Sequence, residues 1–202
     1  SKLAHATGYD VLSFEYRLAP EFPYPAAVED ALRAWDHLML LGYGARDIML
    51  AGDSAGGNLA LVLCHRLKAA GRRLPGALVL MSPWTDMTMS GASYAERAES
   101  DPMLTPEYIE AVRTAYAGGR DYASPDLSPL FADLTGFPPT LIQAGDHEIL
   151  YSDAEMLCHA LERAGVPCRF EVSEGMWHVF QMFPLRKAAA AMESVARFLL
   201  ER

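Results

Sequence analysis

The chain has 202 residues and a formal net charge of −9, with 51% hydrophobic and 21% charged residues. This size and composition predict one main folded domain and exclude a largely disordered chain. The acidic balance argues against a nucleic-acid partner, because phosphate binding needs a basic surface. No apolar run reaches the roughly 18 residues of a membrane-spanning helix, so we expect no stable insertion into a membrane.

Short apolar runs separated by helical patterns predict β-strands. We expect these strands at Tyr9–Phe14, Asp47–Ala51, Ala77–Ser82, Thr140–Ala144 and Cys168–Val172. Runs of this length without strict alternation are typical of strands buried on both faces of a parallel sheet. The sequence therefore predicts an α/β fold, with a mostly parallel sheet and helices on both faces.

Apolar residues spaced by three and four predict the intervening helices. Ala26–Leu41 precedes Gly42, and glycine commonly ends a helix. Arg186–Leu200 carries one apolar face, and Asp153–Ala164 is expected to begin with Asp153 as its N-cap.

The segment from Pro83 to Pro139 interrupts this alternation. It is rich in Pro, Ser, Tyr and Asp, and contains one convincing helical pattern, Pro106–Tyr116. Long insertions usually form lids or binding loops, so we expect a cap here within a single catalytic domain of residues 1–202.

The run Gly52-Asp53-Ser54-Ala55-Gly56 fits the pattern G-x-S-x-G between a predicted strand and a predicted helix. In that context the serine sits on a sharp turn, and bulk at either glycine is expected to collide with it. Ser54 is therefore the candidate nucleophile, with the Ala55 N–H at the helix start as an oxyanion donor. The alternatives are an incidental serine in a glycine-rich turn, or a phosphate loop. The latter lacks G-K-[ST], and Asp53 would repel phosphate.

A serine nucleophile needs a histidine base and an acid that orients the histidine. Among six histidines, His178 follows the last predicted strand, and the chain order serine, acid, histidine favours it. Three acids precede it on or near one loop: Asp146, Glu148 and Asp153. The residues alone leave the choice among these acids open.

Several motifs together resemble the hormone-sensitive-lipase-like branch of the α/β-hydrolases, a group of carboxylesterases. These motifs are YRLAPE at Tyr16–Glu21, PYPAAVED at Pro23–Asp30, GDSAGGN from Gly52, SPWTD at Ser82–Asp86 and GMWH at Gly175–His178. The resemblance implies an α/β-hydrolase fold and hydrolysis of small-molecule esters with short or medium acyl chains. It also implies an acyl-enzyme on Ser54, no metal or organic cofactor, and homodimerisation in many members.

The family register favours Glu148 as the acid. Counting forward from Pro139, which resembles the start of a family strand, and back from Gly165 both reach Glu148. The offset to the histidine, 178 − 148 = 30, agrees with the family spacing. Asp146 remains the alternative, because the family usually has Asp at this position.

Two departures from the family pattern concern the beginning of the chain. The family has a His-Gly-Gly-Gly oxyanion loop before YRLAP and a strand between the first two predicted here, and both are missing. We therefore expect these residues to be the C-terminal portion of a longer chain, without the N-terminal strands and part of the cap. Within the cap, Trp84, Tyr94 and Tyr108 are expected either to line the acyl pocket or to pack in the core.

Other functions on the same fold remain open. Some relatives have become non-catalytic small-molecule receptors, although retention of both Ser54 and His178 argues against that. An amide or acetyl-group hydrolase is the nearer alternative. The three cysteines, Cys64, Cys158 and Cys168, lack metal or redox spacing and predict reduced thiols in a cytoplasmic protein.

Overall fold

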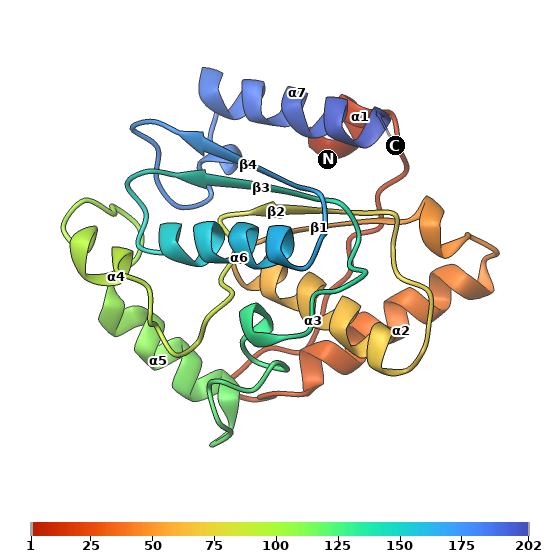
Figure 1. The fold of residues 1–202 in the computed structure, drawn as a ribbon, viewed down its shortest axis with the longest axis horizontal. Coiled ribbons are helices and arrows are strands. Elements are labelled where there is room, and N and C mark those ends of the chain that lie inside the picture. The colour runs from red at the N-terminus through yellow and green to blue at the C-terminus, as the bar shows by residue number, and fades with distance from the viewer. Residues whose placement is uncertain (1, 202) are drawn as a thin grey trace.

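The computed structural model describes residues 2–201, which contain one sheet of four parallel strands in the order β1-β2-β3-β4 (Figure 1). The strands are β1 (Met49–Asp53), β2 (Ala77–Met81), β3 (Thr140–Gly145) and β4 (Cys168–Ser173). Each pairs in parallel with its neighbour, and every connection crosses over through at least one helix. The predicted α/β fold with a parallel sheet is confirmed.

Helices cover both faces of this sheet (Figure 1). On one face lies α7 (Arg186–Leu200), which packs against β3 and against the short α1 (Lys2–Thr7). On the other face lie α3 (Ala55–Ala69) and α6 (Tyr151–Arg163), and α2 (Ala26–Leu40) packs on α3. The sheet is therefore the middle layer of three.

The two sheet faces are apolar because successive side chains of a strand point to opposite sides. Leu78 and Leu80 of β2 join the core beneath α3 and α6. Val79, between them in sequence, joins the core under α7. All three are fully buried, and a buried side chain of this size contributes roughly 1.5–3 kcal/mol. This explains why β2 appears in the sequence as an unbroken apolar run.

The predicted strand at Tyr9–Phe14 is wrong. The segment contains no strand, and large side chains along it are solvent-exposed, with Leu12 at 50% and Val11 at 45%. Within residues 2–201, β1 is an edge strand that pairs only with β2, so no neighbour supplies hydrogen bonds to this segment. An apolar β-prone run becomes a strand only when such a neighbour is present.

The next predicted strand, Asp47–Ala51, is present as β1 but begins and ends two residues later. β1 begins at Met49, because Asp47 ends a short 3₁₀ turn, Ala45–Asp47. Pairing with β2 then extends from Met49 to Asp53, so the strand reaches the residue just before Ser54.

Asp153 is not the N-cap that the sequence predicted. α6 begins at Tyr151, so Asp153 lies in its first turn, where its side chain is completely buried. Its Oδ2 accepts the N–H groups of Thr85 and Asp86 at 2.8 and 2.9 Å. The carboxyl group therefore joins α6 to the chain that leaves β2.

Replacing Asp153 by Ala should lower the free energy of unfolding by about 2–4 kcal/mol, because two buried N–H groups lose their acceptor. Urea unfolding measures this loss. The matched control is Asp133→Ala, since Asp133 is solvent-exposed. Equal stability of the two variants would contradict this assignment.

The pH dependence of stability gives a second test of Asp153. Burial raises the pKa of this carboxyl group from 3.8 to about 8, against the opposing effect of the Thr85 and Asp86 N–H groups. Between these two values the folded state holds a proton that the unfolded state has released, so stability falls as pH rises. We expect Asp153→Asn, a neutral side chain of the same shape, to flatten that fall between about pH 4 and pH 8.

The long segment of residues 83–139 forms two helices and a 3₁₀ turn. These are α4 (Ser93–Glu96), α5 (Pro106–Ala117) and η2 (Pro129–Phe131). The Thr105 side chain caps α5 by accepting the Tyr108 N–H at 3.2 Å, and Gly118 ends the helix in the left-handed conformation. In Figure 1, α4 and α5 lie on the side toward which the strand arrows point.

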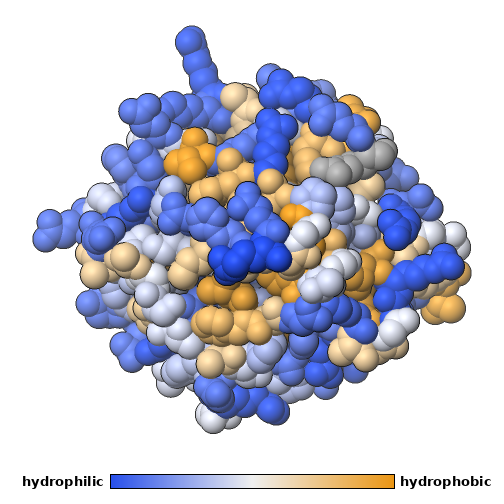
Figure 2. Space-filling model, in the orientation of Figure 1, coloured by the Kyte–Doolittle hydropathy of each residue, from blue (hydrophilic) through white to orange (hydrophobic). Residues whose placement is uncertain are grey.

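Polar residues dominate the face of the molecule seen in Figure 2, with hydrophobic residues in patches between them. Among residues 2–201, no helix is long and apolar enough to cross a membrane.

Candidate active site

Ser54 occupies a strained turn between β1 and α3. Its backbone has φ 51° and ψ −118°, a region that residues other than glycine rarely adopt. The turn brings β1 and the start of α3 so close that a Cβ on Gly52 would lie 2.3 Å from the Gly56 carbonyl oxygen. A Cβ on Gly57 would meet the Pro83 side chain at 2.9 Å.

The expectation for Gly56 is not met. A Cβ at Gly56 would meet nothing within 4 Å among the residues described. The steric restriction therefore applies to position 52, where a side chain would collide with the Gly56 carbonyl group, and not to position 56.

His178 lies beside Ser54 although 124 residues separate them in sequence. Its Nε2 is 2.9 Å from the Ser54 Oγ, and the side chain is almost fully buried. The loop between β4 and the 3₁₀ turn η3 (Phe180–Met182) carries it. The next residue, Val179, donates its N–H to the Ser82 hydroxyl at 3.0 Å, which fixes this loop against the end of β2.

Glu148 lies on the other side of the imidazole. Its Oε2 is 3.4 Å from the His178 Nδ1, and the Glu148 side chain is completely buried. That distance is longer than an ordinary hydrogen bond, as is common at catalytic sites without a bound substrate. Burial raises the pKa of the Glu148 carboxyl group, while His178 and the Ser82 hydroxyl favour its charged form.

The other candidate acids have different neighbours. The Asp146 Oδ1 accepts the N–H of Gly175 at 2.6 Å, which ties the loop after β3 to the loop that carries His178. Asp153 binds the backbone after β2, as described above. In the described part of the chain, the structure therefore brings Ser54, His178 and Glu148 together and assigns both aspartates to backbone contacts.

Ser82 belongs to this site and was missed as a site residue. It is fully buried, has φ 48°, and its hydroxyl lies between the Val179 N–H and the Glu148 carboxyl group. The available signal was its position at the carboxyl end of a central parallel strand, where functional side chains gather.

A family described as "alpha/beta hydrolase fold" matches residues 1–182. The chain belongs to the α/β-hydrolase family. A solved esterase from the bacterial hormone-sensitive lipase family superposes on it with a TM-score of 0.96 and 41% sequence identity. That match covers 98% of this chain and 68% of the esterase, and it confirms the predicted branch of the family.

Two sequence relatives of this hydrolase have related names. An acetyl-hydrolase of Streptomyces hygroscopicus is 40% identical over 98% of this chain and 67% of the relative. An esterase of Acinetobacter venetianus is 38% identical over 97% of this chain and 66% of the relative. The chain thus spans about two thirds of the length of these relatives.

The Ala55 N–H, the predicted oxyanion donor, lies at the start of α3. Ala55 is the first residue of α3, so its N–H has no acceptor within the helix. It directly follows Ser54, and the positive end of the helix dipole adds to the field at this point.

Two of the three predicted pocket aromatics of the hydrolase lie in its core. Trp84 and Tyr94 are buried with α2 and α3 residues in one apolar cluster. Tyr108, on α5, is 58% exposed. The pocket role thus stays a prediction for Tyr108, and core packing accounts for the other two.

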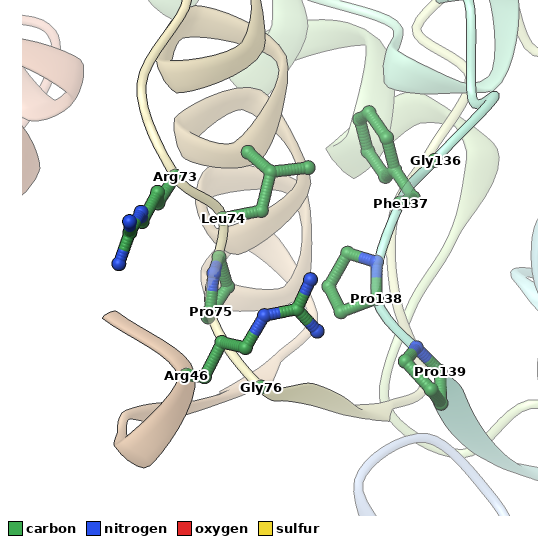
Figure 3. Close-up of a pocket in the computed structure, with 9 residues that line it drawn as sticks. All are labelled: Arg46, Arg73, Leu74, Pro75, Gly76, Gly136, Phe137, Pro138 and Pro139. Carbon is green, nitrogen blue, oxygen red and sulfur yellow. The ribbon is translucent and has the colours of Figure 1, made fainter. Parts of the chain in front are cut away.

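A hollow of about 660 Å³ lies at the end of the sheet where the strands begin (Figure 3). Residues just before β2 and β3 line it, with the Arg46 side chain between Pro75 and Pro138. Ser54 follows the carboxyl end of β1, so this hollow is separate from the catalytic groups.

Proposed function

We propose that this α/β-hydrolase is a serine carboxylesterase that cleaves esters with short or medium acyl chains through an acyl-enzyme. The main evidence is the 2.9 Å contact between the Ser54 Oγ and the Nε2 of a buried His178, with Glu148 on the far side of the imidazole ring. The names of its relatives, an esterase and an acetyl-hydrolase, support the same chemistry.

In the first half of the reaction, the Ser54 Oγ attacks the ester carbonyl carbon while the His178 Nε2 takes the hydroxyl proton. The negative charge that develops on the carbonyl oxygen is stabilised by the Ala55 N–H. Collapse of this tetrahedral species breaks the bond to the alcohol oxygen. His178 gives its proton to the departing alcohol, and the acyl group stays on Ser54.

In the second half, water attacks the acyl carbon and His178 accepts a proton from it. Breakage of the bond to Ser54 releases the carboxylic acid, and the proton returns to the serine oxygen. Glu148 holds the imidazole in the required tautomer and stabilises its charged form. This chemistry requires neither a metal nor an organic cofactor.

Several features of the whole protein belong to the same proposal. Residues 83–139 act as part of a cap over the acyl site. Three unpaired cysteines support a cytoplasmic location, and the acidic charge argues against nucleic-acid binding. Association into a homodimer, common in the family, is checked by analytical ultracentrifugation.

A second candidate is hydrolysis of acetyl groups from small molecules, as esters or amides. The name of the Streptomyces relative favours it. The receptor alternative is not favoured, because a receptor has no use for a histidine in contact with a serine on a strained turn.

A panel of p-nitrophenyl esters, from acetate through butyrate and octanoate to laurate, together with p-nitroacetanilide, tests the proposal. We expect the highest kcat/KM on acetate or butyrate, and little turnover of laurate. Hydrolysis of the anilide at a comparable rate would instead establish an amidase. Tight binding of substrates without any turnover would establish the receptor alternative.

A further inference from the structure

The peptide that follows Glu148 is held on both sides by residues 83–139. The N–H of Ile149 donates to the Asp101 Oδ2 at 2.9 Å. The carbonyl oxygen of Ile149 accepts from the Ser93 hydroxyl, at 2.5 Å. The Ile149 side chain is completely buried. Every polar group of this residue thus has its partner in a segment about 50 residues away in sequence.

Asp101 does more than order its own turn. Its Oδ1 accepts the N–H groups of Met103 and Leu104, which is the usual local use of an aspartate in a turn. Its other oxygen is committed to Ile149, and the residue is 7% exposed. Ordering the turn requires only the Asp101 Oδ1, so the buried Oδ2 is available for the contact with Ile149.

The residue before Glu148 is anchored to a different part of the site. The His147 N–H donates to the Met176 carbonyl oxygen at 3.0 Å, in the loop that carries His178. Glu148 therefore lies between two fixed peptides, one tied to the histidine loop and one tied to Asp101 and Ser93.

Other side chains hold the Glu148 carboxyl group only loosely. Among the described residues, neither of its oxygens has a hydrogen bond of good geometry. The Ser82 hydroxyl is adjacent, and the His178 Nδ1 lies 3.4 Å from the Glu148 Oε2. A longer side chain than the Asp usual in the family also has one more rotatable bond. Where the backbone is placed therefore decides whether the carboxylate reaches the imidazole.

The negative charge of Asp101 disfavours the charged form of Glu148. It adds to the factors that raise the pKa of the Glu148 carboxyl group, because like charges repel. A carboxylate is suited to the position because it accepts from Ile149 and from its own turn at once.

We propose that Asp101 is a positioning residue, which sets the backbone after Glu148 so that this carboxylate orients His178. This inference rests on the proposed esterase function. The segment of residues 83–139 thereby takes part in assembling the catalytic site, in addition to covering it.

The test is Asp101→Asn, which keeps the size of the side chain but leaves one acceptor oxygen for two tasks. We expect kcat on the best ester of the panel to fall about 10- to 100-fold, with KM changed less than about threefold, because orientation is lost and binding is kept. The matched control is Asp121→Ala. Asp121 orders an exposed turn of the same segment through the Ala123 N–H and should leave kcat unchanged.

Two further measurements separate positioning from general loss of structure. When Glu148 has already been replaced by Gln, adding Asp101→Asn should lower kcat less than about twofold further. If Asp101→Asn instead causes a general loss of structure, kcat should fall by the same 10- to 100-fold as in the wild-type background. If Asp101→Asn fails to fold, Ser93→Ala takes its place, because it removes the partner of the Ile149 carbonyl oxygen. Ser93→Ala should then show the same fall in kcat with KM little changed.

A readout without turnover keeps the inference separate from the esterase proposal. The proton on the His178 Nδ1 should give a downfield ¹H NMR resonance that Asp101→Asn shifts or broadens and Asp121→Ala leaves in place. An unchanged resonance in Asp101→Asn overturns the positioning role, whatever the ester panel shows. A changed resonance in a protein that hydrolyses no ester supports the role and rejects the esterase.

Discussion

Replacing Ser54 by Ala should lower kcat on the best ester by roughly 10⁴- to 10⁶-fold. Ser54 supplies the atom that forms the acyl-enzyme, and members of a triad act as a unit, so its loss removes most of the chemical catalysis at once. Among residues 2–201, the one side-chain hydrogen bond of Ser54 is to His178, so the fold should be retained. Purified variant and wild type are compared by initial rates and by circular dichroism.

The control is Ser124→Ala, in a turn of the segment of residues 83–139 remote in sequence from the triad. It should keep wild-type kcat. Near-normal hydrolysis by Ser54→Ala, in a preparation shown to be free of contaminating esterase, would reject the serine mechanism.

Glu148→Gln should lower kcat by roughly 10³- to 10⁴-fold, the loss typical of an uncharged replacement for a triad acid. A glutamine carries no charge to stabilise the imidazolium, and its amide can present a donor to the His178 Nδ1. The wild-type Glu148 is fully buried against that nitrogen, so no water substitutes for the lost carboxylate.

Asp146→Asn is the matched comparison, two residues away on the same loop. Its side-chain oxygen can still accept the Gly175 N–H, the contact that Asp146 makes in the structure. We therefore expect kcat within about tenfold of wild type. If Asp146→Asn loses far more turnover than Glu148→Gln, then Asp146, and not Glu148, orients His178.

The sequence predicted those parts of the fold whose apolar pattern is local. β2, β3 and β4 begin where predicted, and α7 matches the predicted range Arg186–Leu200. β2 and β3 are completely buried between the helix layers, and α7 buries one apolar face, so for these elements the local pattern and its environment agree. β4, at the edge of the sheet, is only partly buried.

The failures have long-range causes. Tyr9–Phe14 has the composition of a strand, but a strand depends on a neighbour that no local pattern shows. Asp153 looked like a helix cap because an acid before an apolar run usually is one. Its true partners, Thr85 and Asp86, are almost 70 residues away in sequence.

The residues of the candidate site also differ in how far local sequence patterns predict them. Ser54 was found from its glycine-rich turn, and His178 from chain order and loop position. The preference for Glu148 needed the family register, because nothing local distinguishes it from Asp146. Asp101 went unnoticed, since its contact with Ile149 depends on how residues 83–139 fold back onto the loop after β3.

The central claim is that Ser54 is an activated nucleophile, and covalent labelling tests it most directly. A fluorophosphonate probe is incubated with the intact protein, and the modified peptide is located by mass spectrometry. We predict stoichiometric phosphonylation of Ser54 and no other serine, with much slower labelling of His178→Ala. Stoichiometric modification of a different serine, or equal labelling of wild type and His178→Ala, would contradict it.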